Sequence, residues 1–266
     1  MREDELVDQS SQSLSGQIIV ISGSTDGLGA DMAREMLAEG ACVVVNGRNA
    51  EKGAAIEAEL AAAHGPDRVL FVAADMRKPD ECENLFKQAV QRFGALDAYV
   101  HCSGVGISPK PFQQAELSSF QPLVEGHLLS AMYACHFAVP HLIARGGGSI
   151  VTIASDAGKV ATPGETLIGC LKAAVIMFTR GLALELSRHG IRANCITPSF
   201  VIDTPANRRL RAGDFTRKLV EKADAKAGLG VTRPSDISSL ALYLVGPHST
   251  RLTGQAVSVN GGISAA

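Results

Sequence analysis

The sequence is poor in aromatic residues and carries little net charge. It has no tryptophan and only 3 tyrosines among 266 residues, and its 25 basic and 27 acidic residues leave a net charge of −2. This balance gives no reason to expect nucleic acid or an anionic membrane surface as a partner. No apolar run reaches the roughly 18 residues of a transmembrane helix, so no membrane span is expected. The polar, acidic stretch 1–16 is typical of a flexible tail and not of a signal or transit peptide.

The six cysteines lie far apart in the chain and form no C-x-x-C pair. Most lie within apolar segments, where thiols of a reduced protein act as small hydrophobic groups. We therefore expect neither a disulfide framework nor a metal site, and the pattern predicts a cytoplasmic protein. The cysteines are Cys42, Cys82, Cys102, Cys135, Cys170 and Cys195.

Strand-like and helix-like patterns alternate along the whole chain, with 46% hydrophobic residues. This alternation predicts a single α/β domain over 17–266: a doubly wound, Rossmann-like parallel sheet in a three-layer arrangement with helices on both faces. Strands are expected at 17–22, 41–46, 68–74, 96–101, 149–154, 191–197 and 256–259. Helices are expected at 28–39, 50–63, 80–93, 117–144, 165–189 and 234–244.

A glycine-rich run follows the first expected strand and opens the first helix. In this context Gly23 permits a tight turn, Gly27 lets the backbone approach a pyrophosphate, and Gly29 lets the helix pack on the strand. The N-terminus of the helix then faces the phosphates. We expect a dinucleotide site lined here by Gly23, Thr25, Asp26, Gly27, Leu28 and Gly29.

The end of the second expected strand carries Arg48 and no acidic residue. An Asp or Glu there would bind the ribose 2′-hydroxyl of NAD, whereas an arginine can clamp a 2′-phosphate with two hydrogen bonds. Arg48 therefore favours NADP over NAD, the alternative being a solvated loop arginine.

A central segment reads as a buried strand, a loop broken by glycine and proline, and a helix that begins near Glu165. Ser155 follows the strand and Lys172 lies on the helix, where open α/β sheets perform chemistry. The run 153–158 and the downstream lysine resemble the active-site segment of short-chain dehydrogenases/reductases. That family has a tyrosine four residues before the lysine, and here the position is Ile168.

The resemblance implies an NAD(P)-dependent oxidoreductase that interconverts a carbonyl and an alcohol of a small-molecule substrate. It assigns Ser155 to polarising the substrate oxygen and Lys172 to holding the ribose, and it places His127 where the family has a relay asparagine. It covers about 16–262. The cofactor positions that it adds are Arg48, Asp75, Met76, Ser103, Gly104, Lys172, Pro198 and Thr204.

The missing tyrosine leaves two interpretations open. In the first, another group transfers the proton, and His127 leads because its unperturbed pKa lies near neutrality; otherwise it is a satisfied helix histidine. Thr166 and Cys170 flank the empty position, but rotation along a helix turns their side chains away from it, so neither simply replaces the tyrosine. Glu165 could transfer the proton if the loop folds over the site. Its alternative is a carboxylate in the first helical turn that the helix dipole stabilises. In the second interpretation the protein binds NADP as a non-redox lyase or isomerase, or without catalysis. A serine hydrolase is disfavoured because the sequence has no Gly-x-Ser-x-Gly elbow. The remaining tyrosines are expected in the core: Tyr99, Tyr133 and Tyr243.

Seven basic residues and three acidic ones lie between residues 207 and 226. In the family this excursion closes over the substrate, so a carboxylate or phosphate on the substrate is one interpretation. A solvated helix face is the other.

Two segments, 131–139 and 173–184, are more broadly apolar than one face of a sheet requires. By resemblance they pair across a two-fold axis in a homodimer, and 252–266 adds the interface of a homotetramer. Ordinary core packing is the alternative.

Overall fold

The computed structural model describes residues 13–106 and 108–266. Within them, seven parallel strands form one sheet in the order β3-β2-β1-β4-β5-β6-β7, which confirms the predicted fold class. The strand order reverses between β1 and β4, and ligands of such sheets bind at this switch point. The strands are β1 (Ile18–Ser22), β2 (Cys42–Gly47), β3 (Val69–Ala73), β4 (Ala98–His101), β5 (Gly148–Ile153), β6 (Ile191–Pro198) and β7 (Ala256–Val259).

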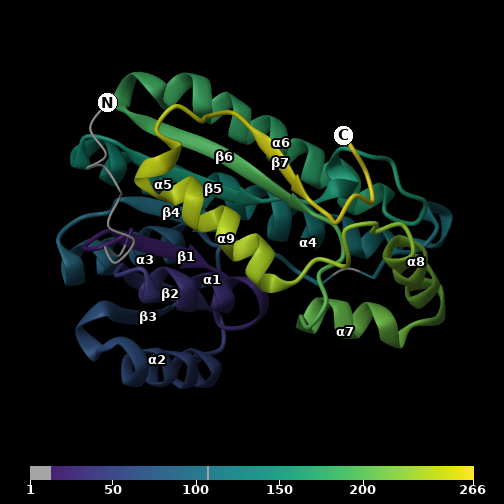
Figure 1. Ribbon diagram of the computed structural model, residues 1–266, viewed down its shortest axis with the longest axis horizontal. Helices are drawn as coiled ribbons and strands as arrows, with labels where there is room; N and C mark the ends of the chain where they lie inside the picture. The colour runs from purple at the N-terminus through teal and green to yellow at the C-terminus, as the bar shows by residue number, and fades with distance from the viewer. Residues whose placement is uncertain (1–12, 107) are drawn as a thin grey trace, which may run out of the picture.

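Helices cover both faces of the sheet (Figure 1). Side chains alternate along β1, so Ile19 and Ile21 pack with α1, α2 and α9, whereas Val20 packs with α3, α5 and α6 on the other face. These two apolar layers form the core. The helices are α1 (Gly27–Ala38), α2 (Ala50–His64), α3 (Pro79–Phe93), α4 (Phe120–Val124), α5 (Ser130–Arg145), α6 (Thr166–Leu186), α7 (Pro205–Ala212), α8 (Asp214–Asp224) and α9 (Pro234–Val245).

The long helix expected at 117–144 is instead four consecutive elements, the first a 3-10 turn at Leu117–Ser119. A π-helical segment, Glu125–Leu129, separates α4 from α5. Gly126 in this segment packs on Val105, and a Cβ at Gly126 would lie only 2.5 Å from the Val105 Cγ1 atom. The wider turn thus brings the helix against the loop after β4, as π-bulges often do at functional sites.

The packed domain begins earlier than the predicted boundary at residue 17. Leu14 is fully buried, and its backbone N–H donates to the Glu39 carbonyl at 2.9 Å. The Ser13 hydroxyl donates to the Glu39 carboxylate at 2.8 Å. Residues 13–16 of the predicted tail therefore belong to the domain, and 1–12 lie outside the described residues.

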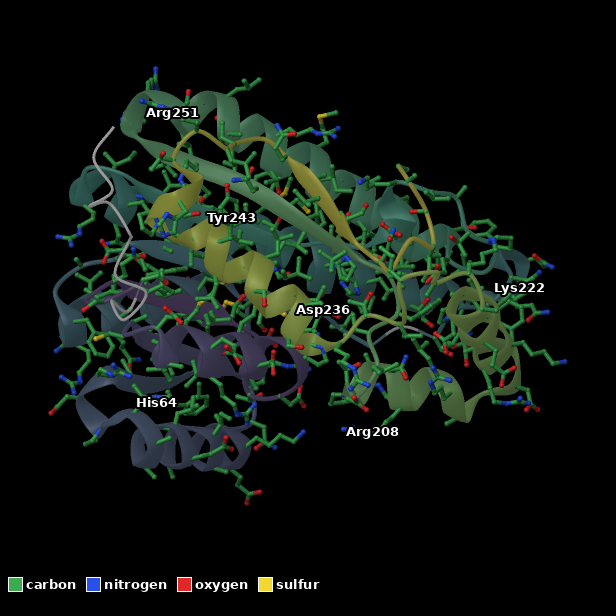
Figure 2. All side chains as sticks on the ribbon, in the orientation of Figure 1. His64, Arg208, Lys222, Asp236, Tyr243 and Arg251 are labelled. Carbon is green, nitrogen blue, oxygen red and sulfur yellow. The ribbon has the colours of Figure 1, made fainter. Side chains whose placement is uncertain are left out.

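The basic excursion folds as α7 and α8, which lie together at one end of the molecule (Figure 1). The labelled side chains of Arg208 and Lys222 lie at this end (Figure 2). Phe215 of α8 packs on Gly164 in the loop after β5, where a Cβ would lie 2.8 Å from the phenyl ring. The α7–α8 pair therefore faces the carboxyl ends of the central strands.

The segment Thr166–His189, which contains α6, is long and apolar enough to span a membrane by length and composition alone. This result differs from the expectation of no membrane span, which rested on the lack of an uninterrupted apolar run in the sequence. In the fold α6 packs on β6 and on the loop after β5, and 33% of its most apolar window is buried. Its exposed side carries Met177 and Leu184.

Candidate active site

A cleft of about 820 Å³ opens at the carboxyl ends of the strands, between the glycine loop, the start of α6 and the α7–α8 pair. It brings together many residues that the sequence assigned to cofactor and substrate. The predicted site residues on its wall are Gly23, Asp26, Gly27, Leu28, Gly29, Gly104, His127, Ser155, Lys172, Pro198 and Thr204.

The glycine loop has the geometry of a phosphate cradle. Gly23 has φ +69°, and a Cβ there would lie 2.8 Å from the Ser103 Cα. A Cβ at Gly29 would overlap the Gly23 carbonyl, whereas one at Gly27 would meet only Pro205, at 3.5 Å. Asp26 is the N-cap of α1 but makes no side-chain capping bond. Free N–H groups at a helix start, beside a backbone open to the cleft, fit a dinucleotide pyrophosphate.

Five predicted cofactor residues do not line the cleft, and two of them support it from behind. Thr25 packs on Gly47, where a Cβ would lie 2.6 Å from the threonine methyl, and the Ser103 backbone packs on Gly23. Met76 is buried in the core, so only its backbone is available to a ligand.

The other two, Arg48 and Asp75, form a charged corner beyond the end of β2. Arg77 lies 2.6 Å from the Asp75 carboxylate and, through this hydrogen bond, lowers the pKa of Asp75 against the opposing effect of burial. The Arg48 guanidinium lies 4.0 Å from Asp75, and its side chain is 58% exposed. Lys52, which sequence reasoning missed, lies 3.3 Å from Asp26. The corner therefore contains a second cation near the glycine loop.

Ser155 and Lys172 are brought together by two glycines. A Cβ at Gly158 would lie 2.7 Å from the Ala173 nitrogen, and one at Gly169 would lie 2.7 Å from the Ala157 carbonyl. The loop after β5 therefore lies directly against α6. The Lys172 ammonium donates to the Ile153 carbonyl at 3.0 Å, and burial lowers the pKa of Lys172.

The Ser155 hydroxyl remains available to a ligand as a donor. Its oxygen accepts a 3.2 Å hydrogen bond from the Ala157 N–H, which leaves the hydroxyl proton free. Because Ser155 lines the cleft, this proton can be donated to a substrate oxygen.

Ile168 lies on the cleft wall and is 7% exposed, so the position of the family tyrosine is an apolar surface. Thr166 and Cys170 do not line this cleft, as the rotation of a helix predicts. Glu165, the N-cap of α6, does line it. Burial raises the pKa of Glu165 to about 7, and its side chain makes no capping hydrogen bond to α6.

His127 does not have the near-neutral pKa on which its selection rested. It is 6% exposed, and burial followed by the charge of Lys172 lowers its pKa to about 3, although the Val105 backbone favours the protonated ring. Both ring nitrogens nevertheless fall outside hydrogen-bonding geometry. His127 therefore lies on the cleft wall as a buried ring whose two nitrogens have no hydrogen-bond partner among the described residues.

A buried polar cluster beneath the cleft was not foreseen. His101, at the end of β4, has its Nδ1 atom 2.8 Å from the Tyr99 hydroxyl and 3.2 Å from the Ser22 hydroxyl. Its Nε2 atom lies 3.5 Å from the Ser130 hydroxyl. Burial, then Lys172 and His127, lower the pKa of His101 to about 3. The alternating apolar pattern of β4 does not reveal such a network.

The tyrosines are not alternative proton donors. Tyr99 is core, as expected, and Tyr133 is half-buried, but Tyr243 is 45% exposed on α9, contrary to expectation (Figure 2). None of the three lines the cleft.

Thr204 serves chiefly as the N-cap of α7. Its hydroxyl accepts from the Asn207 N–H at 3.1 Å and donates to the Val201 carbonyl at 2.9 Å. Asn207 itself lines the cleft, and its buried amide nitrogen has no hydrogen-bond partner in the part of the chain that the structure describes. Together with the free nitrogens of His127, this donor makes the wall suited to a polar ligand.

Asp156, next to Ser155, ties the site to the end of the chain. Its carboxylate accepts from the Asn260 amide at 2.6 Å and from the Ser264 hydroxyl at 2.9 Å. Ser264 also lines the cleft, and no local sequence pattern marks it as a site residue. Among the described residues, no group of three His, Cys, Asp or Glu side chains is arranged to hold a metal.

Comparisons with known proteins agree with this geometry. A family model described as enoyl-(acyl carrier protein) reductase matches residues 23–264. A D-beta-hydroxybutyrate dehydrogenase of Rhizobium meliloti is 29% identical, over 92% of this chain and 98% of its own. A 4-formylbenzenesulfonate dehydrogenase of Comamonas testosteroni is 32% identical, over 94% of this chain and 98% of its own. A solved short-chain type dehydrogenase/reductase from Mycobacterium ulcerans superimposes with a TM-score of 0.88 at 25% identity, covering 94% of this chain and 90% of its own.

The chain therefore belongs to the short-chain dehydrogenase/reductase family. This family consists of oxidoreductases that use NAD(P) and act on small molecules.

Proposed function

We propose that this protein is an NADP-linked oxidoreductase that interconverts a carbonyl and an alcohol with an altered proton-transfer group. The observation that carries the proposal is that the glycine loop, Ser155 and Lys172 line one cleft. A phosphate cradle, a hydroxyl donor and a buried cation on one wall are what binding a dinucleotide beside a polarised carbonyl requires.

The bound cofactor would supply or accept hydride. The N–H groups at the start of α1 hold its pyrophosphate, and Lys172 provides a positive charge close to Ser155. Ser155 donates a hydrogen bond to the substrate oxygen and stabilises negative charge that develops there. We assign His127 the role of a neutral hydrogen-bonding group in the cleft and not that of a general acid, because its pKa of about 3 leaves it unprotonated at neutral pH.

The preference for NADP rests on the charged corner. Arg48 is exposed and only 4.0 Å from a carboxylate that Arg77 already neutralises, so its guanidinium can turn to a 2′-phosphate. Lys52 adds a second cation, although its present partner Asp26 partly offsets it.

We further propose that the substrate carries a carboxylate, phosphate or sulfonate. Arg211 and Arg217 of the α7–α8 pair form ion pairs with acidic side chains. Four other cations form no ion pair among the described residues and line the cleft: Arg209, Lys218, Lys222 and Lys226. Cations left unpaired at the mouth of a cleft favour an anionic ligand. A hydroxybutyrate and a formylbenzenesulfonate, named for two of the relatives, are anions of this kind.

We propose a homodimer or homotetramer that acts in the cytoplasm. The exposed apolar side chains of α5 and α6 support the oligomer, including Met132, Met177 and Leu184. The absence of disulfides among the six free cysteines supports a reducing compartment.

A second function is supported by Ile168. Its apolar side chain fills the position of the family proton donor, which also fits a protein that binds NADP for non-redox chemistry or for none. Replacement of Ser155 by alanine separates the two. An oxidoreductase loses about 10²-fold or more in turnover while keeping its affinity for NADPH, whereas a protein without carbonyl chemistry has no turnover to lose.

A further inference from the structure

We propose that Glu165 is the catalytic acid and base that exchanges a proton with the substrate oxygen in place of the family tyrosine. This assignment rests on the proposed function, because it requires carbonyl–alcohol exchange in the cleft. It concerns a residue outside the family motif.

Glu165 is the N-cap residue directly before α6, next to the first turn of the helix. Ile168 and Lys172, four positions apart in the helix, share a face. All three line the cleft. Thr166 and Cys170, which flank the same turn, do not. Glu165 is thus a proton-bearing side chain one turn before the position at which the family carries its tyrosine.

Glu165 is not consumed by a structural ion pair. No lysine or arginine among the described residues forms a salt bridge with it, and Lys172 on the same cleft wall donates to the Ile153 carbonyl instead. Four cations that line the cleft, Arg209, Lys218, Lys222 and Lys226, likewise form no ion pair among the described residues. A half-buried carboxyl group without a cationic partner on a cleft wall is a recurring feature of general acids and bases.

The surroundings of Glu165 favour its neutral form. Burial has the largest effect and raises its pKa to about 7, and the nearby Asp156 carboxylate raises it further, while a hydrogen bond with Thr162 opposes both. Besides Glu165, the charged and titratable groups on the cleft wall are Asp26, Cys102, His127, Asp156, Lys172, Arg209, Lys218, Lys222 and Lys226. A carboxyl group that titrates near neutral pH can give and take a proton with comparable ease.

Protons and electrons balance in the proposed step. In reduction, the O–H bond of the Glu165 carboxyl breaks and an O–H bond forms on the carbonyl oxygen of the substrate. The carbonyl carbon receives the hydride that the bound cofactor supplies, and the carboxylate regains its proton from water at the open cleft. In oxidation, the Glu165 carboxylate accepts the hydroxyl proton of the alcohol and releases it to water.

The test compares Glu165→Gln and Glu165→Asp with wild type. Glu35→Gln, an exposed carboxyl on α1 outside the cleft, is the matched control. The measurements are the pH profile of kcat/KM over a panel of aldehydes and ketones with NADPH, NADPH affinity by calorimetry, and titration of the Glu165 carboxyl carbon by NMR. We expect Glu165→Gln to lose about 10²- to 10³-fold in kcat together with the limb that titrates near pH 7. NADPH affinity should stay within about twofold, and Glu165→Asp should retain part of the activity.

A double variant separates a proton-transfer role from a structural one. Adding Ile168→Tyr to Glu165→Gln should restore at least about tenfold of the lost kcat, because a phenol can then carry the proton. Loss of NADPH affinity in Glu165→Gln without rescue by tyrosine would assign Glu165 a structural role and overturn the proposal. Wild-type turnover in Glu165→Gln would also overturn it but leave the oxidoreductase function standing. No turnover by wild type over the whole panel would overturn both.

Discussion

Arg48 is the residue that we expect to set the preference for NADPH over NADH. Its guanidinium is exposed, and its nearest carboxylate, Asp75, is already neutralised by Arg77. Replacing Arg48 by aspartate removes the proposed 2′-phosphate clamp and adds a charge that repels this group. We expect the ratio of NADPH to NADH affinity to fall on the order of 10- to 100-fold. Calorimetric titration with both dinucleotides measures the ratio, and an unchanged ratio would exclude Arg48 from cofactor selection.

Two buried histidines make stability sensitive to acid. The pKa values of His101 and His127 fall to about 3 in the fold, against an ordinary value of 6.5. Below pH 6.5 the unfolded chain therefore binds protons that the folded protein does not, so stability falls as pH drops from 6.5 toward 3. Each histidine contributes up to about 1.4 kcal/mol per pH unit.

We expect the His101→Asn variant to lose one such increment from the slope of unfolding free energy against pH. Denaturant unfolding at several pH values between 4.5 and 6.5 measures the slope. The exposed His248→Asn variant is the control. An identical slope in wild type and His101→Asn would show that His101 titrates normally in the fold.

Sequence spacing predicted several residues that line the cleft, but the sequence did not predict side chains whose pKa is shifted by burial. Gly23, Ser155 and Lys172 stand at fixed distances from a strand end or within a helix, and all three line the cleft. The pKa of Glu165 depends on segments far along the chain that close around it. The same holds for His127, whose ring lies against Gly104 in a contact that no local pattern encodes.

The loop after β5 packs directly against α6 because a glycine lies at each contact. Replacing Gly169 by alanine would place a Cβ 2.7 Å from the Ala157 carbonyl, so the loop that carries Ser155 must move. We expect a loss of about 1–3 kcal/mol in unfolding free energy and a larger loss in kcat. The matched control is Gly228→Ala, whose Cβ would meet nothing within 4 Å.

Denaturant unfolding and steady-state kinetics on both variants check this prediction. If Gly169→Ala were as stable and active as Gly228→Ala, the close approach of loop and helix would have no functional role.

Most elements follow from period and turn residues, but two departures have physical causes. The expected helix at 117–144 is interrupted by the π-helical segment, where Gly126 packs closely against Val105. The expected tail shortens because the single apolar residue Leu14 finds a buried position, which a polar average over 1–16 conceals. Tertiary contacts override local pattern in both places.

The exposed apolar side of α6 predicts how the whole molecule associates. Leu184 is 81% exposed there, in a helix apolar enough to pass for a membrane span. A charge at the centre of an apolar subunit interface is strongly destabilising, so Leu184→Asp should convert a dimer or tetramer into smaller species. The control is Leu229→Asp, 90% exposed in the loop after α8.

Sedimentation velocity gives the mass of each variant. A wild type that is monomeric, or a Leu184→Asp variant with the mass of wild type, would contradict the proposed interface.

The architecture of the molecule could be read from the sequence because alternation of strand and helix restricts the topology to few solutions. The separation of paired from unpaired cations could not be read in the same way. Arg211 and Arg209 lie two residues apart in one basic run, yet the first pairs with Asp224 and the second lines the cleft. Only the packing of α7 on α8 distinguishes them.

We propose that this cleft performs cofactor-dependent carbonyl chemistry without the family tyrosine. The most direct measurement is NADPH consumption by wild type over a panel of neutral and anionic aldehydes and ketones, in parallel with Ile168→Tyr. We predict consumption by wild type, fastest with anionic substrates, and its loss in Ser155→Ala. Tight NADPH binding with no consumption until tyrosine is restored would contradict the account and leave a protein that binds the cofactor for another purpose.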